Sequence, residues 1–388
     1  MSRLKKVMSK KRILFLTSTR ADFSKLKSLI LTLQKNKNFD VNVFVTGMHL
    51  LKSYGYTINE LYRSKIKNIY KFKNQNEKLY SMTKSLASTV NGLSQYILRK
   101  NIDLIVIHGD RMEALAGAIA GTFNNIHVGH IEGGELSGTI DESIRHAVSK
   151  LSHFHFVSNK ESKKRLIQMG EDKKTIFMIG SPDLDIMKSK NLPNLQDSKI
   201  FYGIKFNNYS IIIFHPVTTN KDENHKNLKI IDRIVNEELD QNFICINPNN
   251  DPGSLKFLRL YKKLKKKRNF ICFPSMRFEY FLTFLKYANC IIGNSSTGVR
   301  EAPFYGVNCI NVGTRQNNRT KDSKLIYNSD DYNDVIKSFA KIIKKGKTKY
   351  KEKIFGSGNS NKKMQKILSG NKFWKLKIQK TFNDLDKT

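Results

Sequence analysis

The chain has 388 residues, of which 39% are hydrophobic and 26% charged, and no apolar run approaches the roughly 20 residues of a membrane span. These values predict a folded protein of two or three domains and exclude a disordered or membrane-embedded chain. The formal net charge is +36. The basic residues are spread along the whole chain, and no zinc-finger, RNP-like or KH-type motif occurs, so we expect no nucleic-acid partner and no membrane partner.

Short apolar runs alternate with amphipathic segments through the first half of the chain. The apolar runs predict strands at residues 12–17, 41–47, 103–110, 126–132, 153–158 and 175–182. The segments between them predict helices at residues 23–34, 85–100, 113–123 and 141–151. The apolar run from Ile13 to Leu16 is too short for the core of a signal peptide, so we expect a cytoplasmic protein.

A second alternating set follows a polar, proline-containing stretch at residues 181–199. It predicts strands at residues 210–216, 242–249, 269–275, 289–296 and 308–313, and helices at residues 227–239, 254–267, 278–288 and 299–306. Such alternation is typical of parallel sheets covered by helices on both faces. We therefore expect an α/β protein with domains at 1–190 and 191–370, and a C-terminal helix at 371–388 that packs back on the first domain.

The sequence indicates neither a metal nor a cofactor. The four cysteines, Cys245, Cys272, Cys290 and Cys309, form no CxxC pair and are read as buried thiols of a reducing compartment. No Cys/His cluster has metal-ligand spacing, and no GxGxxG follows the first strand, so a nicotinamide cofactor is not expected.

Polar sequences follow six of the predicted strands, and ligands of open parallel sheets bind beyond the carboxyl ends of the strands. The sequences are TSTRAD, HGDR and HIEGGE in the first half and FHPVTT, NPNND and GNSSTG in the second. Their division between the halves predicts one cleft between two domains.

In the first half, Arg20 and Asp110 stand at two such strand ends. The guanidinium of Arg20 suits a diphosphate, although it could equally be a surface arginine paired with Asp22. Asp110 offers a carboxylate at a strand tip, where it could instead cap the next helix.

The stretch GHIEGGELSGTIDES gathers acids around glycines in a basic chain. Glu132 ends a strand beside Gly-Gly, which lets a ligand approach closely. Asp141 and Glu142 begin a helix and Arg145 lies one turn on, so a capped helix with a local ion pair is the alternative. Carboxylates crowded in a closed site would have one pKa raised, which would allow acid and base roles together.

In the second half, the loop GNSSTG joins a strand end to the start of a helix. Ser295 and Ser296, with the N–H groups of that helix, suit a phosphate, and Glu301 one turn later could hold a ribose. Ordinary capping of the helix is the alternative. His215 ends the first strand of this half, where it could transfer a proton or be structural.

Ten motifs occur in order along the chain: TSTRADFSKLKSLI, VTGMHLLKSYGYTINEL, HGDRMEALAGAIA, HIEGGELSGTIDESIRHAVSKLSH, RLIQMGED, IGSPDLD, FHPVTT, PNNDPGS, GNSSTGVREAP and GTRQNNR. Together they resemble the hydrolysing UDP-N-acetylglucosamine 2-epimerases, in particular the branch that makes precursors of sialic and legionaminic acids. The segments FPSMRFEYFLTFLKYA and KFWKLKIQKTF resemble the legionaminic-type members more. The resemblance implies two Rossmann-like domains whose parallel sheets face a central cleft, the GT-B arrangement.

The resemblance further implies elimination of UDP from a UDP-2-acetamido sugar, followed by addition of water to the 2-acetamidoglucal. The substrate would be UDP-GlcNAc or UDP-N,N'-diacetylbacillosamine, and the products UDP and the free manno-configured sugar. It gives catalytic roles to Asp110, Glu132, Asp141 or its neighbour Glu142, and His215, and binding roles to Arg20, Arg145, Ser295, Ser296 and Glu301. It also implies a homodimer or tetramer. With these roles, we interpret GHIEGGELSGTIDES as the acid side of the cleft, free of nearby cations that would weaken a base, with Arg145 at a phosphate and Glu135 at the rim. A nucleotide-sugar glycosyltransferase of the same fold and a non-hydrolysing epimerase are the alternatives.

Overall fold

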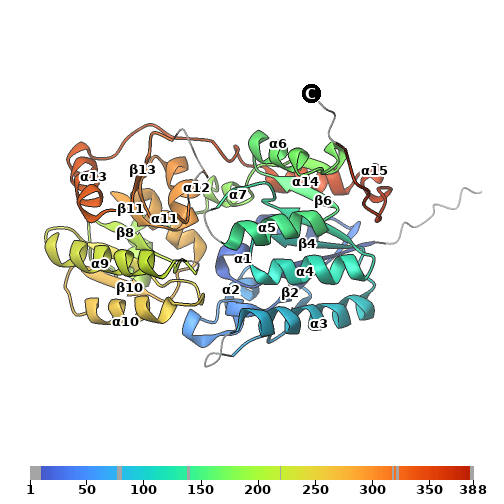
Figure 1. Cartoon of the computed structure of the whole chain (residues 1–388), viewed down its shortest axis with the longest axis horizontal. Helices are drawn as coiled ribbons and strands as arrows, with labels where there is room; N and C mark the ends of the chain where they lie inside the picture. Colours follow the sequence, from blue (N-terminus) through green and yellow to red (C-terminus); the bar gives the residue numbers. More distant parts are fainter. Residues whose placement is uncertain are drawn as a thin grey trace, which may run out of the picture. The chain divides into compact units, whose positions relative to one another are not determined.

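The computed structural model describes residues 10–76, 81–137, 140–218, 220–316, 319 and 323–384. Contacts between residues divide the chain into two compact units. The first comprises Met1–Glu135, Ile144–Asp185 and Gly356–Thr388, and the second comprises Leu136–Ser143 and Ile186–Phe355. Each unit is a parallel sheet with helices on both faces, as the alternation of the sequence predicts (Figure 1).

The sheet of the first unit has the strand order β3-β2-β1-β4-β5-β6-β7, and all its neighbouring strands are parallel. Its strands are β1 (Lys11–Thr17), β2 (Phe39–Val45), β3 (Ile69–Lys71), β4 (Leu104–His108), β5 (His127–Ile131), β6 (Phe154–Val157) and β7 (Ile176–Met178). Its helices are α1 (Arg20–Gln34), α2 (Ile58–Arg63), α3 (Met82–Lys100), α4 (Met112–Phe123), α5 (Ile140–Leu151), α6 (Lys160–Gln168), α7 (Asp183–Met187), α14 (Ser360–Leu368) and α15 (Asn371–Trp374), with 3-10 turns η1 (Gly47–Leu50), η2 (Lys52–Tyr54) and η3 (Lys173–Thr175). The start of α5 and the end of α7 are counted with the second unit.

Strand β1 explains why the strands of this sheet read as unbroken apolar runs. Ile13 and Phe15 pack into one core with α1, α2, α14 and α15. Leu14 and Leu16 point to the other face and pack with α3, α4 and α5. Because successive side chains point to opposite faces and both faces are covered, nearly every position of the strand must be apolar.

The sheet of the second unit has the order β10-β9-β8-β11-β12-β13 and is parallel throughout. Its strands are β8 (Ser210–Ile213), β9 (Phe243–Ile246), β10 (Phe270–Phe273), β11 (Cys290–Gly293), β12 (Asn308–Val312) and β13 (Ile326–Ser329). Its helices are α8 (Leu195–Tyr202), α9 (Lys221–Glu237), α10 (Ser254–Leu264), α11 (Phe278–Tyr287), α12 (Ser296–Tyr305) and α13 (Tyr332–Lys345). One core contains α9, α10 and α13, and the other contains α11 and α12.

The C-terminal part of the chain differs from the predicted bounds. Residues 356–370, expected in the second domain, are counted with the first unit, because Met364 and Leu368 of α14 are buried in its core. The helix predicted over 371–388 is helical only in α15, and the chain continues without helix to residue 384. The ring of Phe373 packs against that of Phe154 with ring centroids 4.0 Å apart, which attaches this segment to the first unit.

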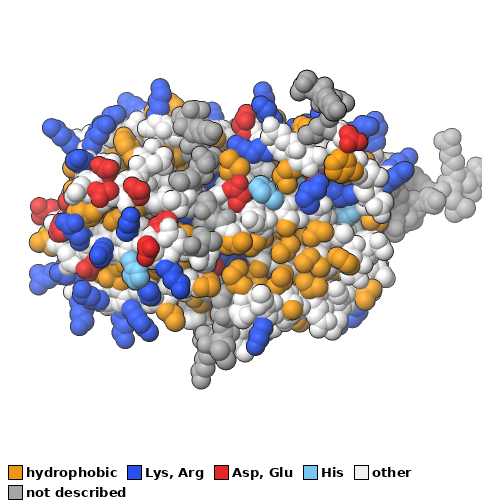
Figure 2. Space-filling model, viewed as in Figure 1, with side chains coloured by type: hydrophobic (Ala, Val, Ile, Leu, Met, Phe, Trp, Pro, Cys, Tyr) orange, Lys and Arg blue, Asp and Glu red, His pale blue; other side chains and the backbone are white. Residues whose placement is uncertain are grey.

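Figure 2 shows apolar side chains gathered over α4 on the surface of the first unit. Two large apolar side chains on the neighbouring helices α3 and α4 are strongly exposed, Leu98 at 70% and Phe123 at 80%. Within the described part of the chain, no helix is both long enough and apolar enough to cross a membrane.

Candidate functional site

The tip of β4 carries a carboxylate that is held by an arginine. Gly109, at φ +74°, turns the chain after β4, and Asp110 follows it. Arg145 of α5 has only 1% of its side chain exposed, and its guanidinium donates to the Asp110 carboxylate and, over 3.0 Å, to the carbonyl of Glu135. The first helical turns of α5 therefore fix the position of Asp110 through a charge-assisted contact.

Glu132, at the tip of the neighbouring strand β5, is buried in a polar cluster. Its carboxylate lies 3.2 Å from His108 Nε2, accepts a hydrogen bond of 3.3 Å from Ser181 Oγ, and lies 3.9 Å from Lys25 Nζ. Lys25 also forms a buried ion pair with Asp183. The backbone of Glu132 has φ +67°, a left-handed conformation that costs energy for a residue with a Cβ atom.

These contacts correct two parts of the sequence interpretation. The acids are not kept apart from cations, because Asp110 contacts Arg145, Glu132 lies near Lys25, and Asp141 contacts Arg315. Glu135 does not line a rim, because it is 2% exposed and its Oε1 accepts a hydrogen bond of 2.8 Å from Ser158.

His130, on β5, connects the Asp110 turn to α5. Its Nε2 donates to the carbonyl of Gly109 over 2.8 Å, so Nδ1 is the acceptor of a 3.0 Å hydrogen bond from Ser149 Oγ. Burial lowers the pKa of His130 to about 3, so the ring is neutral and keeps this pattern at physiological pH. The elements that carry Asp110 and Arg145 thus share one buried anchor.

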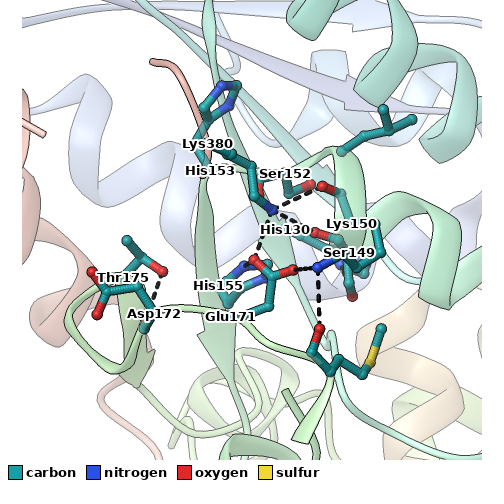
Figure 3. A network of polar contacts seen from close by, with 12 residues as sticks. His130, Ser149, Lys150, Ser152, His153, His155, Glu171, Asp172, Thr175 and Lys380 are labelled. Atoms are coloured by element: carbon teal, nitrogen blue, oxygen red, sulfur yellow. Dashed lines mark hydrogen bonds and ion pairs between the residues drawn. The ribbon is translucent and has the colours of Figure 1, made fainter. Parts of the chain in front are cut away.

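A second network lies at the other end of α5 (Figure 3). The carboxylate of Glu171 lies 2.8 Å from Lys150 Nζ, 2.9 Å from His155 Nε2 and 2.7 Å from Lys380 Nζ. Burial alone would raise the pKa of Glu171, but His155, Lys150 and Lys380 outweigh it and hold the pKa at about 2. Lys380 also donates to the carbonyls of Lys150 and Ser152, which fastens the C-terminal segment to α5.

Arg20 is the first residue of α1, in a loop shaped by Asp22. The Asp22 carboxylate accepts hydrogen bonds from Thr17, Ser18 and Thr19, and Thr19 and Asp22 form a capping box. The loop TSTRAD is therefore built around its aspartate, and Arg20 is presented at the N-terminus of the helix.

In the second unit, the two acids that begin α5 have different contacts. Glu142 accepts a hydrogen bond of 2.9 Å from the backbone N–H of Ser137. This contact fits the alternative given above, in which the acid belongs to a capped helix. Asp141 lies 3.2 Å from Arg315 Nη2. The arginine belongs to the motif GTRQNNR, for which the sequence suggested no role.

The loop after β11 has the geometry of a helix N-terminus that could bind an anion. Ser295 is the N-cap of α12 and accepts a hydrogen bond of 3.4 Å from the N–H of Thr297, while Ser296 is the first helical residue. Glu301 lies further along α12 and is 4% exposed. Hydroxyls and N–H groups at the start of this helix are the donors that phosphates bind.

His215, in the loop after β8, has a fixed ring orientation. Its Nδ1 accepts a hydrogen bond of 3.1 Å from the backbone N–H of Asn249. An N–H group can only donate, so the proton of the neutral ring must be on Nε2. The ring therefore presents a donor, which suits an anionic oxygen.

Among the described residues, no group of three or more His, Cys, Asp or Glu side chains could hold a metal ion. The structure brings Asp110 and Arg145 together in the first unit, with Glu132 on the neighbouring strand. In the second unit, Asp141, His215 and the Ser295 loop are connected through Arg315 and Asn294. No role was predicted from the sequence for Lys25, Arg315 or Asn294, although all three lie in the motifs quoted above.

The sequence of the chain is similar to those of a known protein family. The family model for UDP-N-acetylglucosamine 2-epimerase matches residues 31–369. A UDP-N-acetylglucosamine 2-epimerase of Neisseria meningitidis serogroup B is 42% identical over 380 residues, which cover 97% of this chain and 100% of the relative. A UDP-N,N'-diacetylbacillosamine 2-epimerase (hydrolyzing) of Legionella pneumophila is 32% identical, covering 92% of this chain and 95% of the relative.

The fold agrees with solved structures. The crystal structure of a UDP-GlcNAc 2-epimerase from Neisseria meningitidis bound to UDP-GlcNAc has a TM-score of 0.79 at 20% sequence identity, and the match covers 93% of this chain and 100% of that one. The family model and the 42%-identical relative each extend over most of the sequence. The chain therefore belongs to the UDP-N-acetylglucosamine 2-epimerase family.

Proposed function

We propose that the protein is a hydrolysing 2-epimerase that converts a UDP-2-acetamido sugar into UDP and the free manno-configured sugar. The observation that carries the proposal is the pair of carboxylates, Asp110 and Glu132, at the tips of the adjacent parallel strands β4 and β5. Both are oriented by cations or histidine within the fold, and Asp110 keeps 23% of its side chain exposed. Proton removal from carbon and proton return to it require a preplaced base and acid, and carboxylates can serve as both.

The reaction begins with removal of the C2 proton by a carboxylate. The electron pair of the C2–H bond forms a C1–C2 double bond. The C1–O bond breaks anti to the C2–H bond, and UDP leaves with the electron pair of that C1–O bond. Water then adds its hydroxyl group to C1 of the 2-acetamidoglucal, and a proton is returned to the opposite face of C2. In this proposal Asp110, Glu132 and Asp141 supply the acid and base groups.

The second unit would bind the nucleotide. The Nε2–H of His215, the hydroxyls of Ser295 and Ser296, and the N–H groups that open α12 are donors for a diphosphate. Glu301 would accept hydrogen bonds from the ribose diol. Arg20, at the start of α1, would add positive charge to the leaving group.

Arg145 has a different role in this proposal from the one inferred by resemblance. A guanidinium with 1% exposure that already contacts Asp110 and Glu135 is poorly accessible to a phosphate. We assign Arg145 to orienting the Asp110 carboxylate. Glu142 acts as a helix-start residue through its contact with Ser137.

UDP-GlcNAc is the first substrate to test, because the 42%-identical relative is named for it, whereas the relative named for the bacillosamine sugar is 32% identical. The free manno-configured product would be N-acetylmannosamine, a precursor of sialic acid. UDP-N,N'-diacetylbacillosamine, whose product leads to legionaminic acid, is the second substrate.

The experiment is to incubate the purified protein with each sugar nucleotide in heavy water. We expect UDP release, measured by ³¹P NMR, and deuterium at C2 of a manno-configured sugar, measured by ¹H NMR. UDP release with hydrogen retained at C2 would contradict the elimination, and a sugar that keeps its UDP would indicate a non-hydrolysing epimerase. Asp110→Asn should abolish turnover, while Asp240→Asn, an exposed acid of the second unit, should leave it unchanged.

We also propose that the protein forms a homo-oligomer. The exposed Leu98 and Phe123 and the apolar surface over α4 support this, since large apolar patches on soluble proteins mark interfaces (Figure 2). Phe123→Glu should shift the sedimentation of the protein toward the monomer, whereas Phe382→Glu, at an equally exposed position, should not.

A further inference from the structure

The β8–β11 ladder ends at a glycine that no other residue could replace without movement. Gly293 is paired with Ile213 in register, and its φ is +143°. A Cβ atom at Gly293 would lie 1.9 Å from the carbonyl oxygen of Ile213. The backbones of β8 and β11 therefore approach so closely here that only a glycine fits, and Gly293–Ile213 is the last pair of this ladder.

Beyond this last pair, the side chain of Asn294 makes the hydrogen bonds to the chain that leaves β8. Its Oδ1 accepts a hydrogen bond of 2.7 Å from the N–H of His215, and its Nδ2 donates over 2.8 Å to the carbonyl of the same residue. Because a backbone N–H only donates and a carbonyl only accepts, these partners also fix which amide atom is oxygen and which is nitrogen. Asn294 is fully buried, so water does not compete for these bonds.

Asn224, in the first turns of α9, repeats the contact two residues along the same loop. It accepts a hydrogen bond of 2.8 Å from the N–H of Val217 and donates one of 2.8 Å to the carbonyl of Val217. Each of these side-chain amides thus clamps the N–H and the carbonyl of one residue, His215 or Val217. Pro216 lies between these two residues and has no N–H group. The two asparagine amides therefore satisfy every backbone donor from His215 to Val217.

The backbone of Asn294 is itself held by two side chains. Its carbonyl accepts hydrogen bonds from Arg315 Nη1 at 3.2 Å and from Gln316 Nε2 at 3.1 Å. The same arginine contacts Asp141. The loop 313–314 that precedes Arg315 is fixed by Glu223, which accepts hydrogen bonds from the N–H and hydroxyl of Thr314.

We propose that Asn294 and Asn224 are positioning residues whose paired amide clamps fix the His215 loop, so that Nε2–H of His215 is aimed as a donor at the diphosphate of the sugar nucleotide. The clamps fix the main chain, and the N–H of Asn249 fixes the ring, so both the place and the direction of the donor are set before the ligand binds. This inference rests on the proposed function, because it takes the diphosphate as the partner of His215. Neither asparagine needs to touch the substrate.

The test is a comparison of UDP with uridine as ligands of variant proteins in titration calorimetry. Asn294→Ala and Asn224→Ala should each weaken UDP binding by roughly tenfold, the size expected for loss of about one well-placed hydrogen bond to a charged group. Uridine lacks the diphosphate, so its binding should change less than about twofold. The KM of the sugar nucleotide should rise in parallel with the loss of UDP affinity.

A double-mutant cycle with His215→Ala separates positioning from general damage to the fold. If the clamps act through His215, Asn294→Ala should cost little further UDP affinity once His215 is absent. An equal cost with and without His215 would overturn the inference while leaving the proposed function standing. If His215→Ala itself leaves UDP affinity and turnover unchanged, both the inference and the proposed role of His215 are wrong.

Two further variants guard against a trivial loss of structure. Asn269→Ala removes another buried asparagine of this unit, whose amide donates to the carbonyl of Val235, and it should lower the melting temperature without altering the ratio of UDP to uridine affinity. If Asn294→Ala does not fold, Asn294→Asp keeps the acceptor at nearly unchanged volume and replaces the donor by a carboxylate oxygen that faces the carbonyl of His215. It should show the same selective loss of UDP affinity, and an unchanged affinity would count against the clamp.

Discussion

The guanidinium of Arg145 contacts the carboxylate of Asp110 from a position where 1% of the arginine side chain is exposed. The two residues lie 35 positions apart in the sequence, at the end of a strand and in a helix. The contact holds the proposed proton-transfer carboxylate from one side, while the hydrogen bond from His130 to Gly109 holds the turn beneath it. The position of Asp110 is thus fixed by three separate elements of the first unit, β4, β5 and α5.

Arg145→Lys tests the orientation of Asp110. A lysine keeps the charge but lacks the planar fork that reaches both Asp110 and the carbonyl of Glu135. We expect kcat to fall by up to about 100-fold, as small misplacement of a catalytic group does, with a smaller change in KM. Arg63→Lys, which alters the pair of the exposed Arg63 with the buried Glu60, is the control and should have normal kinetics. Unchanged kcat in Arg145→Lys would show that the contact does not position Asp110.

The first unit should lose stability between pH 6.5 and pH 4. Burial lowers the pKa of five of its histidines, to about 4 for His49 and His153, to about 3 for His130, and below the usual value for His127 and His155. Above pH 6.5 these rings are neutral in both the folded and the unfolded chain, so they do not change the free energy of unfolding. Below it the unfolded chain takes up protons that the folded chain does not, so the free energy of unfolding falls.

The measurement uses Trp374, the single tryptophan, which lies in the first unit. Urea unfolding followed by its fluorescence should show a lower midpoint at pH 5 than at pH 7, with about 2 kcal/mol lost for each histidine whose folded pKa is about 4 or less. His153→Asn should reduce this pH dependence, and His225→Asn, an exposed histidine of the second unit, should not. Equal midpoints at both pH values would contradict the prediction.

Lys380 should stabilise the first unit from the C-terminal segment. Lys380→Met removes hydrogen bonds of 2.7 and 2.8 Å to the carbonyls of Ser152 and Lys150 and the contact with Glu171 (Figure 3). We expect the free energy of unfolding to fall by about 2–3 kcal/mol. Lys377→Met changes an exposed lysine of the same segment and should leave it within about 0.5 kcal/mol. A similar loss in both variants would indicate a general effect of charge.

Gly293→Ala should disrupt the second unit, because the added methyl group would meet the carbonyl of Ile213. We expect a loss of several kcal/mol, about the size of severe backbone conflicts, and loss of UDP binding. Gly203→Ala is the matched control, since Gly203 also has a positive φ but nothing lies within 4 Å of the added atom. Its cost should stay at about 1–2 kcal/mol. Normal UDP binding by Gly293→Ala would mean that the loop adapts.

The sequence was sufficient to predict the inner strands and most of the helices between them, because each inner strand is buried on both faces and reads as an apolar run. The edge strands β3 and β13 were missed, since Ile69 and Ile326 are only partly buried and the apolar signal there is short. The prediction of a C-terminal helix was wrong because of a tertiary contact. The carbonyl of Leu376 accepts a hydrogen bond from His127, which holds the chain along the first unit.

Asp110, Glu132 and His215 follow the ends of β4, β5 and β8, as the apolar runs predicted, but the strand-end rule could not give their partners. Lys25 lies about a hundred positions from Glu132, and Arg315 lies 174 positions from Asp141, so neither pairing has a local signal. The same holds for Asn294, which clamps a backbone 79 positions away. Position at a strand end is a property of local sequence, whereas the partners depend on which strands become neighbours in the sheet.

The discontinuity of the first unit has a consequence for the order of folding during translation. Met364, Leu368 and Phe373 belong to its core, yet they are synthesised after the whole of residues 186–355. While the ribosome synthesises the second unit, part of the apolar core of the first unit therefore remains exposed to solvent. A nascent chain in that state is exposed to aggregation and is a substrate for chaperones until the last helices emerge.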